Sequence, residues 1–505
     1  MRPKITSLLL IATLATAALF FKLGSVRLDF LDESIYAESA KEMVQTGDWL
    51  TPHWNGVAFF QKPPILMWLT ALLFKGFGIS ETAARTVAAL SGVGAVITTL
   101  LLARRYFDEI PAVVATLALL FSAPFFTFAR SAMMDVLLTF FILLAVYAYL
   151  RTKENARWWL LVGTSCGLAV MTKGAATAPF LISLLAASIW DRTNLTREVW
   201  AALLLFLVIG GTWHFVMFDL YGQAFLADYF GLHVLARATS GVDEQAKGFF
   251  YYLPVVGLFL PLLPFGLYRL WKQRDLPVII PLFGLMTILF FSTAATKHAW
   301  YIVPALPFLS ILIAPARGSV FTLRIYVLML LLSVVATAIN LKQNKANTAA
   351  YASVADLSLR AKLDSGAIGV FPEIDIGPEV LFYSDRHLCV DRDTQHTMAP
   401  MAQCSTPPEH IILPAQDLEQ LRVRYDLTQL ATSGAFVYCR ADPLSSRSRD
   451  SVLREELHCE GPSRRCVLTR RKSGSAAREV NLRCINCINV RHIPAKIPAK
   501  QIMPS

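Results

Sequence analysis

The chain has 505 residues, of which 55% are hydrophobic and only 16% are charged, with a mean hydropathy of +0.49. A soluble chain of this length carries about 25% charged residues, so the composition excludes an ordinary soluble globular protein. The formal net charge of +11 does not indicate a nucleic-acid partner, because much of it lies in the connections between apolar blocks.

The apolar residues occur in blocks of about 17–25 residues, the length at which a helix crosses a bilayer. The first block, 5–21, follows a short basic start; no small-residue cleavage site follows it, so we interpret it as a retained helix. Further blocks predict spans at 84–103, 111–129, 132–150, 157–172, 175–190, 199–218, 249–268, 277–295, 300–315 and 321–340. The sequence therefore predicts an all-α polytopic membrane protein with roughly 11–13 transmembrane helices, eleven by these blocks.

Two features refine this topology. Residues 64–79 are apolar but short and carry Lys75, which predicts an amphipathic helix at the interface or a re-entrant one. Alternate connections are basic, which predicts a cytoplasmic N-terminus and places everything after about 341 outside. The basic residues in question are Arg104, Arg105, Arg151, Lys153, Arg157, Arg192, Arg197, Arg269, Lys272, Arg274, Arg317 and Arg324.

The remainder divides into two parts. Short β-like runs (AIGVF, HIILP, FVYC) within 351–440 predict a small α/β periplasmic domain, so we set the domains at 1–340, 341–440 and 441–505. The last part is a Ser/Arg-rich basic tail without apolar periodicity. Seven of the eight cysteines follow residue 388. They are compatible with disulfides, for instance Cys389 with Cys404, or with a zinc site, although the spacing is poor for a zinc ribbon. That site would use Cys459, Cys466, Cys484 and Cys487.

Polar residues gather on the predicted outer side. Charged groups at membrane depth are costly and tend to be functional. A carboxylate there can remove a proton from an acceptor hydroxyl, and cations can hold the oxygens of a phosphate. The outer ends and loops carry Asp32, Glu33, Lys62, Arg130, Asp135, Lys173, His233, Lys297 and His298.

Each of these residues also has a structural interpretation. Asp135 is placed to cap a helix, and Lys173 to extend toward the interface. Lys62 precedes two prolines and can hold a loop in place. His233 can be a hydrogen-bonded loop histidine, and Asp32 with Glu33 a solvated pair. The functional interpretation depends on their coincidence on one side of the membrane.

Several motifs resemble one family. The stretch DESIYAESAKEMVQTGDWLTPHWNGVAFFQKPPILMWL at 32–69 resembles the first periplasmic loop of bacterial aminoarabinose transferases of lipid A. These enzymes belong to the GT-C superfamily, which includes the protein O-mannosyltransferases. RSAMMD at 130–135, MTKG at 171–174 and TKHAWYIVPALP at 296–307 resemble later motifs of the family. The resemblance covers roughly residues 1–340.

The resemblance implies inverting transfer of a sugar from a polyprenyl-phosphate carrier to a lipid A-like glycolipid or a protein. It implies a bacterial inner-membrane protein with a periplasmic active site, and no nucleic-acid partner. Asp32 matches the catalytic carboxylate and Asp135 a second acid, with Glu33 next in line. Lys62 matches the residue that binds the carrier phosphate, and Arg130 and Lys297 are further candidates for that charge. The remaining candidate site residues are Tyr36, Lys173, His233 and His298.

One departure from the family concerns a metal. The aminoarabinose transferases have a Glu before the Lys-Pro pair and a later His associated with a metal. Here Gln61 takes the first position and His233 is the nearest match to the second. An amide is a poorer metal ligand than a carboxylate, so the sequence argues against a divalent cofactor and for glycosyl transfer in general.

Two other classes stay open at this point. A polytopic transporter usually shows internal repeats and acids at mid-membrane depth. Here we find no repeat, and the acids lie at predicted helix ends. A polysaccharide ligase or polymerase uses the same carrier lipid but moves a different group.

Overall fold

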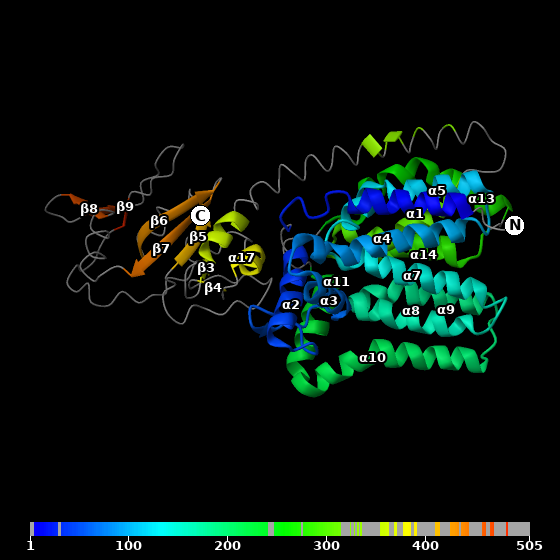
Figure 1. The fold of residues 1–505 in the computed structure, drawn as a ribbon, viewed down its shortest axis with the longest axis horizontal. Coiled ribbons are helices and arrows are strands. Elements are labelled where there is room, and N and C mark those ends of the chain that lie inside the picture. The colour runs from blue at the N-terminus through cyan, green and yellow to red at the C-terminus, as the bar shows by residue number, and fades with distance from the viewer. Residues whose placement is uncertain are drawn as a thin grey trace.

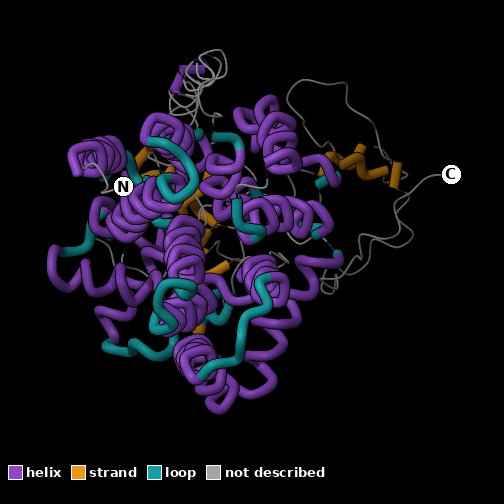
Figure 2. The backbone as a smooth tube through the Cα atoms, turned by 90° about the vertical axis from the view of Figure 1, so that its right-hand side faces the viewer, coloured by secondary structure: helices purple, strands orange, loops and turns teal. Residues whose placement is uncertain are grey.

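The computed structural model describes residues 5–28, 32–240, 247–273 and 276–314, and beyond these only separate shorter stretches that end at residue 482. Long helices lie side by side in one bundle, and a small sheet lies beyond one end of it (Figure 1). Viewed from the side, the helices are seen nearly end-on with strands behind them (Figure 2). The predicted helical membrane body is therefore present.

Four helical stretches of the described chain are long and apolar enough to cross a membrane by length and composition. They are Glu81–Ala103 (α4), Met134–Arg151 (α7), Trp158–Trp190 and Arg197–Tyr221, the last within α10 (Arg197–Leu226). The stretch Trp158–Trp190 consists of α8 (Trp158–Lys173), the 3₁₀ turn η1 (Gly174–Thr177) and α9 (Ala178–Trp190). Shorter apolar helices are α1 (Ile5–Phe20), α3 (Ile65–Phe77), α5 (Glu109–Leu120), α14 (Ile279–Thr293) and η5 with α15 (Ala299–Ala305 and Leu306–Leu312).

Two predicted spans differ from the structure. The block 111–129 is divided into α5 and α6 (Ala123–Phe128), with a proline at the start of α6. The block 249–268 is broken into short helices, because Gly257 has a φ of +20° and prolines interrupt the hydrogen-bond ladder. Its pieces are η3 (Phe249–Tyr251), α12 (Tyr252–Val256), η4 (Gly257–Leu262) and α13 (Leu263–Gln273). The predicted span 321–340 lies largely outside the described residues.

The first long loop begins with a helix, α2 (Asp32–Thr46), that ends at Gly47, whose φ is +79°. A two-stranded hairpin follows, β1 (His53–Trp54) and β2 (Val57–Ala58). Asn55 and Gly56 form its turn, and both have positive φ, as a type I′ turn requires. Helix α3 then covers only 13 residues. That is about 20 Å, shorter than a membrane core, which agrees with the prediction that this segment does not cross the membrane.

The three β-like runs are strands of one five-stranded sheet with the order β4-β3-β5-β7-β6. β3 pairs parallel with β4 and β5, whereas β7 pairs antiparallel with β5 and β6. The strands are β3 (Ile368–Val370), β4 (Leu388–Val390), β5 (His410–Pro414), β6 (Tyr425–Ser433) and β7 (Phe436–Pro443). Three short strands follow, β8 (Leu457–Glu460), β9 (Arg465–Leu468) and β10 (Asn481–Leu482). Cys404, Cys484 and Cys487 lie outside the described residues, so the disulfide and zinc predictions stay predictions.

A helix of this small domain, α17 (Gly377–Ser384), packs on α2 (Figure 1). The buried Lys41 ammonium donates hydrogen bonds to the carbonyls of Leu381, at 3.3 Å, and Phe382, at 2.8 Å, in the last turn of α17. The Tyr383 hydroxyl accepts a hydrogen bond from the Leu28 amide and donates one to Glu81. These contacts hold the helix that begins at Asp32 against both the membrane body and the small domain.

Candidate active site

Two adjacent carboxylates at the start of α2 lie in different surroundings. Asp32 is half-buried and shares a hydrogen bond with the Tyr36 hydroxyl one turn further along the helix. Burial raises the pKa of Tyr36 well above its usual value, so the phenol stays protonated and can donate to the carboxylate. Within the described part of the chain, Asp32 makes no ion pair closer than 4 Å.

Glu33 instead forms what we call the Glu33–Arg85 clamp. Its two carboxylate oxygens accept hydrogen bonds from the guanidinium of Arg85, both at 2.8 Å. One of them also accepts the amide of Ala132 at 2.7 Å. Arg85 further donates to carbonyls of the connection that follows α1. Both oxygens of Glu33 are therefore engaged in hydrogen bonds within the protein.

Lys62 lies at the end of a connection that is fixed at several points. The indole N–H of Trp68 donates to the Trp49 carbonyl, and that of Trp213 donates to the Leu50 carbonyl. Pro63 and Pro64 are buried directly before α3. The half-buried Lys62 makes no ion pair among the described residues. Burial, and then the positive charge of Arg237, lowers the pKa of Lys62 to about 7.

Asp135 and Lys173 form a buried ion pair between α7 and α8, with Nζ and Oδ1 at 2.5 Å. The N-cap residue of α7 is Met133, so Asp135 does not act as a helix cap. The ammonium of Lys173 points inward and not toward the interface, and lies 5.0 Å from the ring centroid of Tyr301. The second oxygen of Asp135 has no hydrogen-bond partner in the described part of the chain. That oxygen is available to a bound molecule.

The glycine of the MTKG motif has a clear physical basis. Gly174 ends α8 with a φ of +52°, a conformation that disfavours other residues. A Cβ at this position would lie 1.9 Å from the hydroxyl oxygen of Tyr229. The Tyr229 hydroxyl also contacts Nε2 of His214 at 2.9 Å. Glycine therefore allows the Tyr229 segment to approach the end of α8 beside Lys173.

A cavity of about 140 Å³ is lined by Lys62, Lys173, His233, Arg237 and Tyr301. Asp32 and Asp135 do not line it, but they act electrostatically on Lys62. One wall is the π-helix η2 (Ala227–Ala236), followed by α11 (Arg237–Thr239), and the opposite wall is the end of α14. The segment after η2 is fixed by backbone hydrogen bonds from Ala295 and Thr296 to Ala238 and Arg237. We call the following residues the cavity cluster: Asp32, Tyr36, Lys62, Asp135, Lys173, His233, Arg237, His298 and Tyr301.

Two histidines belong to the cavity cluster. His233 lines the cavity and its Nε2 lies 3.4 Å from Asp228. Burial lowers the pKa of His233, and Asp228 offsets this only in part. His298 stacks on Trp300, with ring centroids 4.3 Å apart. Burial lowers the pKa of His298 to about 4, so both imidazoles are neutral at physiological pH.

Two predicted phosphate ligands are engaged elsewhere. The guanidinium of Arg130 donates to the carbonyls of Ala18, Leu19 and Phe21 at the end of α1, which it caps. The buried ammonium of Lys297 donates to the carbonyls of Lys247 and Ala294. The structure therefore does not bring either cation into the cavity cluster.

Sequence reasoning missed Arg237, Tyr229 and Tyr301. Arg237 lines the cavity and shares a hydrogen bond with Tyr301. It lies outside the motifs that resemble the family, in the stretch VLARATS, and gave no distinct signal. Tyr301 did lie in the TKHAWYIVPALP motif, and its place in that motif was the one available signal for it.

The residues present do not fit a divalent metal. No group of three or more His, Cys, Asp or Glu side chains that could hold one gathers in the described part of the chain. Gln61 lines the cavity where the family resemblance leads one to expect a carboxylate. We therefore derive no step of the reaction through a metal.

Comparison with known proteins gives three results. Residues 61–213 match the family described as dolichyl-phosphate-mannose-protein mannosyltransferase. An uncharacterised protein of Aquifex aeolicus is 32% identical over 58% of this chain and 70% of its own length. The undecaprenyl phosphate-alpha-4-amino-4-deoxy-L-arabinose arabinosyl transferase 1 of Pseudomonas fluorescens Pf-5 is 30% identical over 54% of this chain and 53% of its own length. The chain thus spans about half the length of the curated transferases it matches.

Among solved structures, ArnT from Cupriavidus metallidurans, crystallised with undecaprenyl phosphate, matches 88% of this chain and 99% of its own chain. The TM-score is 0.72 at 19% identity, which shows a shared fold. The chain shares this fold of a polytopic membrane protein. It belongs to one family with the Aquifex protein, and part of it is similar to the aminoarabinose transferases and to the mannosyltransferase family.

Proposed function

We propose that this protein is a membrane glycosyltransferase that moves a sugar from a polyprenyl-phosphate carrier to an acceptor on the periplasmic side of the inner membrane. The observation that carries the proposal is the cavity cluster. Lys62, Lys173 and Arg237 line one cavity, and the carboxylates of Asp32 and Asp135 lie near enough to act electrostatically on Lys62. Such a set of opposite charges around a cavity is typical of a catalytic site.

The carrier phosphate would be held by Lys62 with Arg237. Both side chains line the cavity, and no carboxylate of the described residues lies within ion-pair distance of the Lys62 ammonium. A phosphate would supply that missing negative charge through charge-assisted hydrogen bonds. Two related proteins support a polyprenyl carrier: the Pseudomonas transferase is named for undecaprenyl phosphate, and ArnT was crystallised with it.

Asp32 would act as the general base. It is half-buried, has no ion-pair partner among the residues that the structure describes, and is oriented by the Tyr36 hydroxyl. As the bond from the anomeric carbon to the carrier phosphate breaks, Asp32 accepts the proton of the attacking acceptor hydroxyl from the opposite face of the sugar. Attack opposite the leaving group inverts the anomeric configuration. Lys62 and Arg237 stabilise the charge on the departing phosphate.

Asp135 would orient a reacting hydroxyl. Lys173 holds one of its oxygens, while the other oxygen has no hydrogen-bond partner among the described residues. This arrangement leaves a fixed acceptor that can bind a hydroxyl of the sugar or of the acceptor. The acceptor itself we place in the class of periplasmic glycolipids, such as lipid A, or proteins.

The test is transfer in vitro with purified full-length protein. A panel of polyprenyl-phosphate sugars is offered with glycolipid and peptide acceptors, and products are identified by mass spectrometry and by anomeric NMR coupling. We expect one donor to yield an inverted product, and Asp135→Asn to reduce transfer. Retention of configuration, or no transfer from any polyprenyl-phosphate sugar, contradicts the proposal.

A further inference from the structure

A second cavity lies far from the cavity cluster. It has a volume of about 670 Å³ and is enclosed by α8, α9 and α10. Trp159 and Cys166 of α8 line it, whereas Lys173 of the cavity cluster is at the other end of the same helix. Trp159 and Lys173 are separated by about 20 Å along the helix axis. The two cavities are therefore distinct sites at opposite ends of the bundle.

The wall of this cavity is almost entirely apolar. Its side chains include Leu181, Leu184, Leu203 and Phe206, and several of them face outward between α9 and α10. The volume falls in the range of about 300–1,000 Å³ that is common for ligand sites. Helices α8 and α10 meet closely beside it, because Gly163 lies against the backbone of Ala202. The close seam forms the floor, and the opening faces the bilayer.

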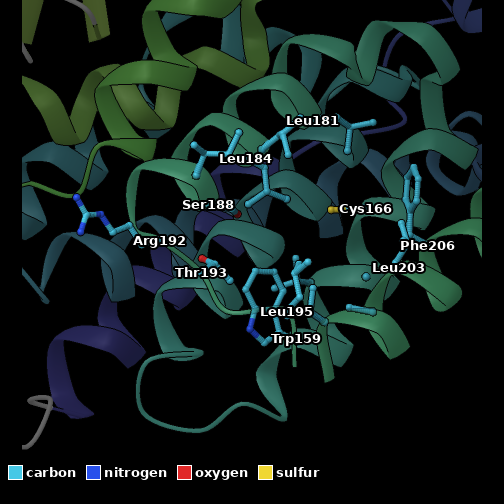
Figure 3. Close-up of a pocket in the computed structure, with 16 residues that line it drawn as sticks. Trp159, Cys166, Leu181, Leu184, Ser188, Arg192, Thr193, Leu195, Leu203 and Phe206 are labelled. Atoms are coloured by element: carbon cyan, nitrogen blue, oxygen red, sulfur yellow. The ribbon is translucent and has the colours of Figure 1, made fainter. Parts of the chain in front are cut away.

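Polar groups occur at one end only. Figure 3 shows Arg192, Thr193 and Ser188 toward one end, and Cys166, Leu203 and Phe206 toward the other. The Arg192 side chain is exposed and makes no ion pair in the described part of the chain. Exposed tryptophans, Trp190 and Trp200, lie at the same ends of α9 and α10, as is usual at a membrane interface.

The backbone at Arg192 is held in an unusual conformation. Its φ is +51°, in the left-handed region that a non-glycine residue rarely adopts. The preceding Asp191 fixes the turn, because it accepts a hydrogen bond from the Tyr149 hydroxyl at 2.9 Å and pairs with Lys153 at 3.0 Å. Strain of this kind persists where the surroundings impose it and frequently marks a functional position.

We infer that this cavity binds an anionic diacyl phospholipid from the leaflet opposite the active site. One acyl chain fills the apolar space, and the guanidinium of Arg192 holds the headgroup phosphate, with the hydroxyl of Thr193 beside it. Arginine favours phosphate through paired hydrogen bonds. On the predicted topology this end faces the cytoplasm, where anionic lipids give the membrane a negative surface. A neutral lipid lacks the net charge that the free guanidinium matches.

The test uses Cys166, which lines the cavity and is the one cysteine before residue 389. Purified, delipidated full-length protein is treated with a lipophilic maleimide, and modification of the Cys166 peptide is measured by mass spectrometry. The probes are dioleoylphosphatidylglycerol, dioleoylphosphatidylcholine and undecaprenyl phosphate. We expect phosphatidylglycerol to slow the modification by 1 + [L]/Kd, about tenfold at ten times Kd, and phosphatidylcholine to protect far less.

Two variants make the test specific. Arg192→Gly removes the guanidinium and relieves the positive φ, so the protein stays folded while protection by phosphatidylglycerol is lost. Arg197→Ala, which removes an exposed arginine paired with Glu198 outside the cavity, leaves protection unchanged. Equal protection by the two diacyl lipids, or unchanged protection in Arg192→Gly, overturns the proposal. Stronger protection by undecaprenyl phosphate would mean that the cavity binds the tail of the carrier lipid. Protection that depends only on protein concentration would mean that a second copy of the chain covers the cavity. Either result also overturns the proposal.

Discussion

The Glu33–Arg85 clamp and the cavity cluster are neighbouring polar regions that differ in how completely their charged groups are hydrogen-bonded. In the clamp, both oxygens of Glu33 are bound and Arg85 donates to a set of backbone carbonyls. In the cavity cluster, Asp135 has an oxygen without a partner among the described residues and Lys62 has no ion-pair partner there. Asp32 and Glu33 are adjacent in sequence but belong to different regions.

This difference in hydrogen bonding gives a criterion for distinguishing charged residues with a structural role from those with a functional role. Buried polar groups are normally satisfied, and a satisfied pair has no capacity left for a ligand. A buried or half-buried group that lacks a partner is costly unless a bound molecule supplies one. By this criterion Glu33, Arg130 and Lys297 stabilise the structure, and Asp32, Lys62 and Asp135 are the groups that we propose contact the substrate. The predictions for Asp32, Glu33 and Lys62 test this division.

The largest effect is expected for Asp32→Asn. Loss of a general base typically reduces the rate by about 10²–10⁴-fold. Because Asp32 is half-buried and has no ion-pair partner in the described chain, the melting temperature should hardly change. The measurement is kcat with the donor identified in the transfer assay. Asp48→Asn is the matched control, since its oxygen caps a turn in the same loop and an amide can do the same. Near-normal turnover of Asp32→Asn would refute its role.

Glu33→Gln should mainly affect folding. Removal of one partner of a buried ion pair costs about 3–5 kcal/mol, because the remaining charge is left uncompensated. We expect a lower melting temperature and lower yield, with turnover per folded molecule largely retained. The double variant Glu33→Leu with Arg85→Met should recover part of the stability. A stable but inactive Glu33→Gln protein would transfer the role of base to Glu33.

Lys62 should govern a pH dependence of donor binding. Its pKa is lowered from 10.5 to about 7 in the unliganded protein, so the ammonium is present below pH 7 and is lost as the pH rises through 7. Donor affinity should therefore fall above pH 7. A charged hydrogen bond contributes about 1.5–3 kcal/mol, so Lys62→Ala should weaken binding by roughly 10–150-fold. Titration calorimetry between pH 6 and 9 measures both effects.

Two controls separate this role of Lys62 from loop stabilisation. Lys62→Arg keeps its charge at all these pH values, so its donor affinity should be independent of pH. The unfolded chain binds the Lys62 proton between pH 7 and 10.5 and the folded chain does not, so Lys62 makes the unliganded fold more stable as the pH rises through that window. Lys62→Met should remove this slope. A destabilised Lys62→Ala protein with unchanged donor affinity would favour a purely structural loop residue.

The smallest effect is expected where Tyr383 of α17 contacts Leu28 and Glu81 of α4. Tyr383→Phe removes the acceptor for the Leu28 amide and the donor to Glu81. A buried donor left without a partner costs about 1–3 kcal/mol. Thermal unfolding should show this loss, with only a small decrease in kcat because Asp32 itself is untouched. A larger loss of activity than of stability would mean that the small domain positions α2 during the reaction.

Sequence patterns predicted the parts that depend on local composition. Apolar blocks predicted most helices, and β-like runs predicted β3, β5 and β7. The convergence of Asp32, Lys62, Asp135, Lys173, His233 and His298 followed from the alternation of basic loops together with the family motifs. The hydrogen-bond or ion-pair partner of each charged side chain could not be predicted from the sequence. Arg85 is 52 residues from Glu33, and nothing in the local sequence distinguishes a clamp from an exposed pair. The same holds for Arg130 and Lys297, because the backbone carbonyls that accept their hydrogen bonds could not be identified from the sequence.

Because η2 is a π-helix, the number of residues within it determines which side chains face the cavity. Its hydrogen bonds join residues five apart, which amounts to one residue more than an α-helix uses, and such turns occur mostly at functional sites. Tyr229, His233 and Arg237 recur at intervals of four and all line the cavity because of this wider turn. Deletion of a single residue within η2 would restore ordinary α-helical winding and rotate everything beyond the deletion by about 100°. Arg237 would then point away from the cavity although no cavity residue had been substituted. Insertions and deletions in this segment among related proteins should therefore change the site as much as substitutions of its charged residues.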